Sequence, residues 1–434
     1  MRRDRSVVAG EFERLAEKYQ VVGAQAGLLR LTGPDGAAAV ELATTGILNT
    51  ESGAPVIDQA LFQIGSITKV WTTCVALQLA DEGRLDLDAP VHDALPEFAL
   101  AGPECGVTTR HLLSHTSGIP GDLFNDTGRG DDALRRFVAG LRQVSPLHPP
   151  GDGFSYSNSA FAVAGRLIEV LCECTWDDAI RDRIIKPLGL RHTATLPEQV
   201  LLHAAAAGHV MAEDGAVTRA NVWGIPRSMG PAGGVSATVR DLLSFATIFL
   251  REDTTVLSPS AIRAMRRPHK PWGLGWALDR WGEVEVLQHD GSTPGQSAFL
   301  RVFPALGCAA ALLCTGPEAD GLAREFFTGI ANRLNIPGPP TFTPLPGTCA
   351  APETGTYVNG ESSVRIDLDG DAFVATLTSP FPIAGATGRL RSRLEAIRPG
   401  LYTASHPQKH GGEPVRFSAD HLMWGLRRFN KVLA

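Results

Sequence analysis

The sequence predicts a mixed α/β (α+β) protein with strands at both ends of its first 336 residues, a mostly helical stretch between them and a separate β-rich module after them. Near the start, a helix at 10–19 precedes two strand-like runs, 23–31 and 37–48, joined by a turn at 33–36. Strand-like runs return later, at 276–278, 284–289, 298–303 and 308–315. A last helix is expected at 321–334. Beyond residue 349, short apolar and polar alternations around Gly-containing turns indicate small strands.

The segment that follows the first strands has the pattern of a buried helix. Apolar residues recur at i, i+3 and i+4 spacing and end at a glycine: Ile67, Val70, Trp71, Cys74, Val75, Leu79 and Gly83. Ser66 and Lys69 are three residues apart, so they share one face of this helix. At a first helical turn, free backbone N–H groups and the helix dipole favour negative charge developing on Ser66.

Lys69 can take a proton from Ser66 only if its amine is uncharged. A solvated lysine is protonated at neutral pH, so its pKa must be lowered by burial or by nearby cations. Burial at the junction of two domains would do this. Ser-x-x-Lys also occurs at ordinary exposed helix ends, and the interpretation therefore depends on the rest of the chain.

Tyr156, Ser157 and Asn158 follow the turn-rich stretch 149–155 and precede an apolar helical run at 160–171. A tyrosine and an amide in this position can supply a phenolic proton shuttle together with an amide donor and acceptor. The same residues also fit a packing aromatic and a helix N-cap. No other tyrosine lies between Tyr19 and Tyr357, which favours the functional interpretation.

His289, Asp290 and Gly291 stand at the end of the strand-like run 284–288. Glycine at this point would let a substrate backbone approach the strand closely. Alone, His289 fits a structural histidine. Its position after the serine–lysine and tyrosine–asparagine groups favours a place in the same site.

In this order the three groups resemble the motifs of the class C β-lactamase and penicillin-binding-protein superfamily of serine hydrolases. Two further segments fit that family, Leu-Leu-Ser-His-Thr-Ser-Gly-Ile at 112–119 and Pro-Ala-Gly-Gly-Val-Ser at 231–236. The resemblance spans roughly residues 10–335. It implies a β-lactamase-like fold, with an antiparallel sheet flanked by helices, a helical lobe, and the active site in the cleft between them.

The resemblance also assigns roles to individual residues. It implies that Ser66 is the acylated nucleophile and that Lys69 helps to take its proton. Tyr156 would relay a proton to and from the leaving group and the incoming nucleophile, as general acid or base. Asn158 would orient Lys69 and the substrate amide.

The resemblance further implies an oxyanion hole formed by the backbone N–H groups of Ser66 and Ser292. Such donors contribute about 3 kcal/mol each in known cases. His289 would line the pocket beside Tyr156, and Asp290 and Gly291 would be substrate-pocket residues on the same strand.

The third motif departs from the lactam-hydrolysing members, which usually carry Lys-Thr-Gly and use the lysine to hold the substrate carboxylate. Histidine is only weakly charged at neutral pH, and the next residue here is acidic. His-x-Gly is what the esterase, D-amino-acid peptidase and transacylase branches tend to show. The motif therefore argues against an antibiotic-resistance function.

Composition and resemblance together predict the domain organisation, and 434 residues are enough for two or three domains. A Pro- and Gly-rich linker separates the serine hydrolase domain from a small, barrel-like β-rich module. We expect the hydrolase domain at 1–336 (sheet lobe about 1–83 and 266–336, helical lobe about 84–265), the linker at 337–349 and the module at 350–434. In this superfamily such modules often lean over the active site.

Several classes of partner are disfavoured. A net charge of −6 gives no basic footprint for nucleic acid. The N-terminus lacks a signal-peptide apolar region and no stretch of about 18 apolar residues exists, so we expect no membrane span and a cytoplasmic protein. Seven cysteines indicate reduced thiols. Neither the pair Cys172 and Cys174 nor the pair His111 and His115 completes a zinc site, and we expect no metal and no cofactor.

These observations predict an acyl-transfer enzyme in which Ser66 takes an acyl group from an ester, thioester or amide. We favour a small-molecule or peptide-like acyl donor and an amine acceptor, as in a biosynthetic transacylase or a peptide-cyclising thioesterase. A hydrolytic esterase or a D-stereospecific peptidase fits the same residues, and a non-catalytic penicillin-binding-like protein is the remaining alternative. The expected pocket-lining loops lie at 122–126, 222–228 and 294–297.

Overall fold

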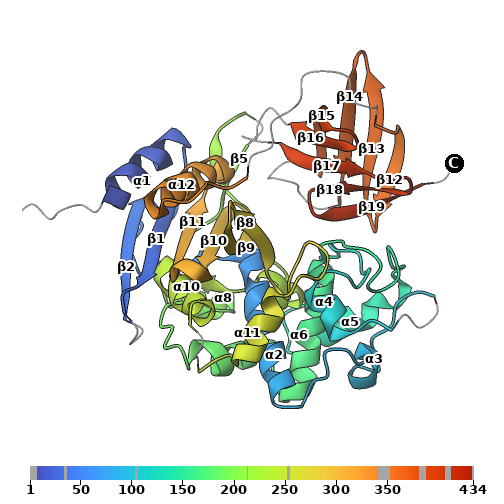
Figure 1. Ribbon diagram of the computed structural model, residues 1–434, viewed down its shortest axis with the longest axis horizontal. Coiled ribbons are helices and arrows are strands. Elements are labelled where there is room, and N and C mark those ends of the chain that lie inside the picture. Colours follow the sequence, from blue (N-terminus) through green and yellow to red (C-terminus); the bar gives the residue numbers. More distant parts are fainter. Residues whose placement is uncertain are drawn as a thin grey trace, which may run out of the picture.

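The structure, a computed structural model, describes residues 7–33, 37–102, 106–212, 214–251, 255–340, 352–380, 388–405 and 412–432. Within these ranges an antiparallel six-stranded sheet forms the centre of the larger domain, in the order β2-β1-β11-β10-β9-β8 (Figure 1). Its strands are β1 (Gly23–Leu31), β2 (Ala38–Gly46), β8 (Ala277–Trp281), β9 (Val284–Thr293), β10 (Gln296–Phe303) and β11 (Cys308–Thr315). The predicted α/β class is confirmed.

The two ends of this domain meet in one sheet because β1 pairs with β11, with Gly23 opposite Thr315. Both faces of the sheet are covered. Helices α1 (Val7–Lys18) and α12 (Ala319–Leu334) pack on one face, and α10 (Val239–Ala246) packs on the other (Figure 1). Successive strand residues point to opposite faces, so Leu28 joins the cluster under α1 and α12 while Leu29 joins the larger core on the other side.

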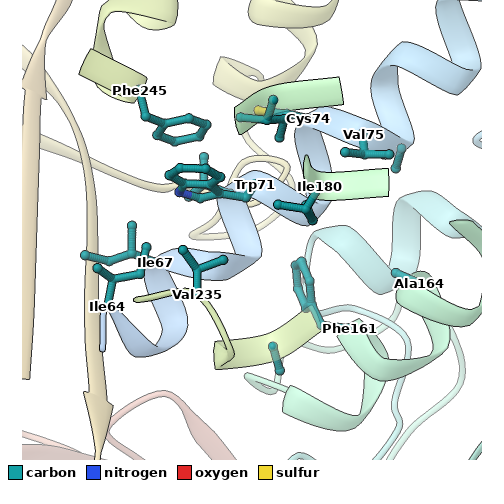
Figure 2. Packing of buried hydrophobic residues seen from close by; sticks show 14 of the residues in the cluster. Ile64, Ile67, Trp71, Cys74, Val75, Phe161, Ala164, Ile180, Val235 and Phe245 are labelled. Atoms are coloured by element: carbon teal, nitrogen blue, oxygen red, sulfur yellow. The ribbon is translucent and has the colours of Figure 1, made fainter. Parts of the chain in front are cut away.

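Helix α2 (Thr68–Asp81) runs through that larger core and is buried along almost its whole length. Trp71 stacks on Phe245 of α10 with ring centroids 4.1 Å apart (Figure 2). The other side of helix α2 packs against α6 (Asn158–Cys172) and α9 (Gly230–Gly233) of the helical lobe. Because α2 is held from both sides, residues at its N-terminal end have a fixed position between the sheet and the helical lobe.

Short elements complete the larger domain. The remaining helices are α3 (Val91–Ala94), α4 (Thr109–Leu113), α5 (Ala133–Gly140), α7 (Trp176–Ile180), α8 (Pro197–Val200) and α11 (Pro259–Arg266). Single helical turns are η1 (Gly65–Ile67), η2 (Leu141–Gln143), η3 (Arg181–Ile185), η4 (Arg227–Met229), η5 (Thr247–Phe249) and η6 (Pro304–Leu306). Small sheets are formed by β3 (Phe62–Gln63), β7 (Ser236–Ala237) and β4 (Thr193–Ala194), and by β5 (His209–Met211) and β6 (Val217–Arg219).

The C-terminal module is a closed antiparallel barrel of strands β12 to β19 (Figure 1). Alternate residues fill its interior, among them Tyr357, Trp424 and Phe429. The strands are β12 (Gly355–Asn359), β13 (Ser362–Asp369), β14 (Ala372–Thr378), β15 (Arg389–Arg398), β16 (Leu401–Ser405), β17 (Glu413–Phe417), β18 (His421–Trp424) and β19 (Arg427–Lys431).

A predicted strand boundary near the candidate site is wrong, and some predictions cannot be compared. The strand expected to end at His289 continues to Thr293, so the third motif lies inside β9; Gly291 and Ser292 weaken the strand pattern without ending the strand. Residues 34–36 of the predicted turn, 341–349 of the predicted linker and the N-terminal six residues lie outside the described residues. Among the helices that are described, none is long and apolar enough to cross a membrane.

Candidate active site

Ser66 lies in the turn η1, which continues directly into α2 because Ile67 and Thr68 both have right-handed helical backbone angles. Its flanking residues Gly65 and Ile67 are buried, whereas Ser66 itself remains partly exposed. The serine therefore stands at the N-terminal end of a buried helix and is itself partly exposed.

Lys69 lies one turn further along, and its side chain is fully buried. Its Nζ lies 3.0 Å from Ser66 Oγ, 2.6 Å from Asn158 Oδ1 and 2.7 Å from the carbonyl oxygen of Ala232. Burial, and secondarily the positive charge of Arg427, hold the lysine pKa well below its usual value. An uncharged amine that donates to Asn158 and Ala232 keeps its lone pair for the proton of Ser66.

Tyr156 also lies beside the nucleophile, because the Ser66 side chain is one of the groups that lower the pKa of its phenol. Burial raises the phenol pKa above its usual value, so at neutral pH the hydroxyl carries its proton. The Nζ of Lys69 lies 4.9 Å from the centre of the Tyr156 ring. A buried amine whose pKa is lowered and a phenol that carries its proton thus lie at the same serine.

Asn158 begins α6 but is not its N-cap. Ser157 is the cap, and its hydroxyl accepts a hydrogen bond from the backbone N–H of Ala160 at 3.0 Å. The Asn158 amide is therefore free to bridge Lys69 and Asp122, to which its Nδ2 donates at 2.8 Å. The alternative interpretation of Asn158 as a helix cap is wrong.

Strand β9 packs against η1 at two glycines. A Cβ added to Gly291 would lie 1.9 Å from the carbonyl oxygen of Ile64 and 2.9 Å from the backbone nitrogen of Ser66. A Cβ added to Gly65, whose φ is +50°, would lie 2.6 Å from the backbone nitrogen of Ser292. The absence of both side chains brings together the Ser66 and Ser292 nitrogens, the pair predicted to form an oxyanion hole.

The pleat of β9 separates the residues of the third motif. His289 and Gly291 are buried toward the nucleophile, whereas Asp290 and Ser292 point to the other face of the sheet. Asp290 forms an ion pair there with Arg301 of β10. Its side chain therefore does not join the group around Ser66, and only its backbone does, by accepting a hydrogen bond from His289 Nδ1 at 2.8 Å.

His289 is buried, with its ring centroid 6.3 Å from that of Tyr156. Burial lowers its pKa to about 4, so the ring is neutral at neutral pH. Because Nδ1 donates to the Asp290 carbonyl, Nε2 is an acceptor, and it has no hydrogen-bond partner among the described residues. The site thus has a neutral acceptor where lactam-hydrolysing relatives place a lysine.

The sequence did not predict that two residues of the barrel, Leu426 and Arg427, belong to the site. Arg427, at the start of β19 in the barrel, forms a two-point ion pair with Asp122 and lies 5.3 Å from the centre of the Tyr156 ring. The carbonyl of Leu426 accepts the backbone N–H of Tyr156 at 2.8 Å. Asp122 begins a loop that was expected to line the pocket, but no motif or spacing marks Arg427.

The sequence of the larger domain matches a family model described as Beta-lactamase over residues 8–332. The chain belongs to the beta-lactamase family. Among the described residues of this family member, no three His, Cys, Asp or Glu side chains gather as a metal site would require.

Individual relatives extend the comparison. The beta-lactamase family member is 42% identical to penicillin-binding protein 4 of Amycolatopsis lactamdurans, over 68% of this chain and 81% of the relative. It is similar over 99% of both chains to the solved structure of SurE, with a TM-score of 0.80 and 28% identity. SurE has also been solved with D-Leu. A D-stereospecific amidohydrolase from Streptomyces sp. shares 27% identity, with a TM-score of 0.61 over 75% of this chain and 99% of that one.

Proposed function

We propose that this protein is a serine acyl-transfer enzyme that forms an acyl-enzyme on Ser66 and passes the acyl group to an amine. The donor is a peptide-like or other small-molecule ester, thioester or amide. The observation that carries the proposal is the contact between Ser66 Oγ and the buried amine of Lys69, 3.0 Å apart. Burial lowers the pKa of that amine, which favours the unprotonated state that a base requires.

The geometry supports a two-step reaction. In the first step, Ser66 Oγ attacks the acyl carbon and its proton passes to Lys69. The carbonyl oxygen becomes an oxyanion that the N–H groups of Ser66 and Ser292 stabilise. Collapse of this intermediate breaks the bond to the leaving group, which takes up a proton relayed through Tyr156. In the second step the acceptor attacks the acyl-enzyme, loses a proton through the same groups and releases Ser66.

An amine acceptor is favoured by His289. Its Nε2, which has no hydrogen-bond partner in the part of the chain that the structure describes, is a neutral acceptor beside Tyr156, and an incoming amine can donate an N–H to it. Arg301, which contacts the same motif, is held by Asp290 on the other face of the sheet and is therefore turned away from a substrate carboxylate. The names of the relatives, SurE with D-Leu and a D-stereospecific amidohydrolase, further support a D-configured residue in the acyl donor.

Hydrolysis is the second candidate, because the solved relatives include a D-amino acid amidase and a D-stereospecific amidohydrolase, whose names describe transfer to water. Both candidates share the acyl-enzyme and differ only in the group that discharges it. The acceptor is therefore the property that an experiment must determine.

Intact-protein mass spectrometry tests both steps. The wild-type protein and Ser66→Ala are incubated with p-nitrophenyl esters, a peptidyl thioester ending in a D-residue and a cephalosporin, each with and without added amine. We expect an acyl mass on the wild type alone, discharged faster by the amine than by water. Equal discharge by water makes the protein a hydrolase, and a lack of any adduct with all of the donors contradicts the acyl-enzyme.

A further inference from the structure

His115 holds an unusual position directly after α4, within the segment 112–119 that the mechanism leaves without a role. Its backbone has φ +58°, in the left-handed region that residues with a side chain seldom occupy. Its side chain is fully buried, with Nε2 lacking a hydrogen-bond partner among the described residues. A conformation of this kind costs on the order of 1 kcal/mol and persists only where the surroundings impose it.

The contacts of His115 surround Tyr156. The His115 carbonyl accepts the backbone N–H of Ser155 at 3.0 Å, and its Nδ1 accepts the backbone N–H of Ser157 at 3.0 Å. Between these two bonds the imidazole stacks on the Tyr156 ring, with centroids 4.2 Å apart and planes 27° from parallel. One residue thus holds the backbone on both sides of the tyrosine and one face of its ring.

We propose that His115 is a positioning residue that clamps Tyr156 so that its hydroxyl stays on Ser66. The left-handed backbone lets the carbonyl and the side chain of one residue reach Ser155 and Ser157 together. The inference goes beyond the proposed function and depends on it only for the kinetic readout. Tyr156 is the group that moves a proton, and His115 touches neither the nucleophile nor the acyl group.

The residue type follows from the contacts. The clamp needs a flat ring for stacking and an uncharged acceptor for the Ser157 N–H. A histidine whose Nδ1 accepts a hydrogen bond carries its proton on Nε2 and is neutral. Burial, with Lys69 as the next cause, holds the His115 pKa well below its usual value and keeps this state. Phenylalanine would supply the ring alone, and asparagine would supply an acceptor and a tolerance for positive φ alone.

Two variants separate these contributions, with p-nitrophenyl ester turnover as the assay. We expect His115→Phe to lower kcat on the order of 100-fold with little change in KM, because a displacement near 1 Å is enough for such a loss. His115→Asn should recover part of that loss by restoring the acceptor. His111, which immediately precedes that segment, is the matched control, since its Nδ1 also accepts a backbone N–H, that of Thr108 at 3.2 Å. His111→Phe and His111→Asn should leave kcat unchanged.

A double-mutant cycle with Tyr156→Phe decides whether His115 acts through the tyrosine. If it does, His115→Phe changes the residual rate by less than about threefold in the Tyr156→Phe background, since residues acting as a unit are not additive. An additive penalty, or an equal loss in the His111 variants, overturns the inference. Where turnover is too slow to follow, the rate at which a fluorophosphonate labels Ser66 is compared across the same four proteins. If His115→Phe does not fold, the cycle is run with His115→Asn.

The two proposals fail in different ways. A wild-type protein that is neither acylated nor labelled at Ser66 contradicts the proposed function. A wild-type protein that is acylated, but whose His115 and Tyr156 variants are additive, contradicts the clamp alone.

Discussion

Arg427 of the barrel and Asp122 of the hydrolase domain form a two-point ion pair across 305 positions of sequence, with Arg427 Nη2 2.9 Å from Asp122 Oδ1. The same Asp122 oxygen accepts a hydrogen bond from Asn158, which in turn accepts one from Lys69. A residue of the C-terminal module is therefore two side chains away from the amine that contacts the nucleophile. The barrel is part of the electrostatic environment of Lys69.

This arrangement predicts opposite pH effects for the two members of the pair. Arg427 lowers the Lys69 pKa and Asp122 raises it. The active amine is unprotonated, so activity rises as pH increases through that pKa. Arg427→Met should shift the acid limb of kcat/KM toward higher pH, and Asp122→Asn should shift it toward lower pH. The pH profile of ester turnover measures both, and shifts in the same direction would show that the pair acts only through structure.

Ser66→Ala should abolish acylation and turnover and leave the fold intact, because the side chain is partly exposed and its loss opens no cavity in the core. Adduct mass and circular dichroism measure the two properties on the same samples. Substantial residual turnover in a folded variant would place the nucleophile elsewhere.

Lys69→Met and Tyr156→Phe should each lower kcat by several orders of magnitude, because both groups contact one oxygen and act as a unit. The double variant should be scarcely slower than the worse single variant. Stopped-flow measurement of the acylation step tests this, and a product of the two separate losses would contradict a shared role.

The relation between Ser66 and Lys69 could be predicted because the two residues are close together in the sequence. Ser66 and Lys69 are one helical turn apart, so a periodic pattern is enough to place them on one face. The fold class followed from strand patterns that are clear in buried runs such as 308–315. The predicted strand ends at His289 because aspartate and glycine, which follow it, are depleted in strands, although here Gly291 is needed for close packing on η1.

The long-range part could not be predicted in the same way. Arg427 stands in a short strand of alternating polar residues and is indistinguishable in pattern from its neighbour Arg428, which pairs with Asp420 within the barrel. Only the docking of the β18–β19 turn on Tyr156 selects Arg427 for the site. The direction of Asp290 away from the pocket likewise depends on the register of β9, which a strand boundary drawn at His289 leaves undetermined.

Protonation of His289 should make stability depend on pH. Its pKa falls from 6.5 to about 4 on folding, so the unfolded chain binds the proton more readily between these values. The stabilisation is fully present above pH 6.5 and is lost as pH falls toward 4, amounting to about 2 kcal/mol between pH 7 and pH 5. Urea unfolding at both pH values should show a smaller loss for His289→Gln than for the wild type. An equal loss would mean that the buried ring is already charged.

Gly291→Ala should lower catalysis steeply and should also destabilise the protein, because the atom that its Cβ would meet is backbone. The new Cβ would lie 1.9 Å from the Ile64 carbonyl oxygen, a distance that forces β9 away from η1 and separates the Ser66 and Ser292 nitrogens. Loss of one oxyanion donor lowers kcat by about 100- to 1,000-fold, whereas pairing with β10 continues to hold the strand. Gly140→Ala is the control, since a Cβ there meets nothing within 4 Å. Unchanged kcat in a folded Gly291→Ala variant would place the oxyanion outside this pair of N–H groups.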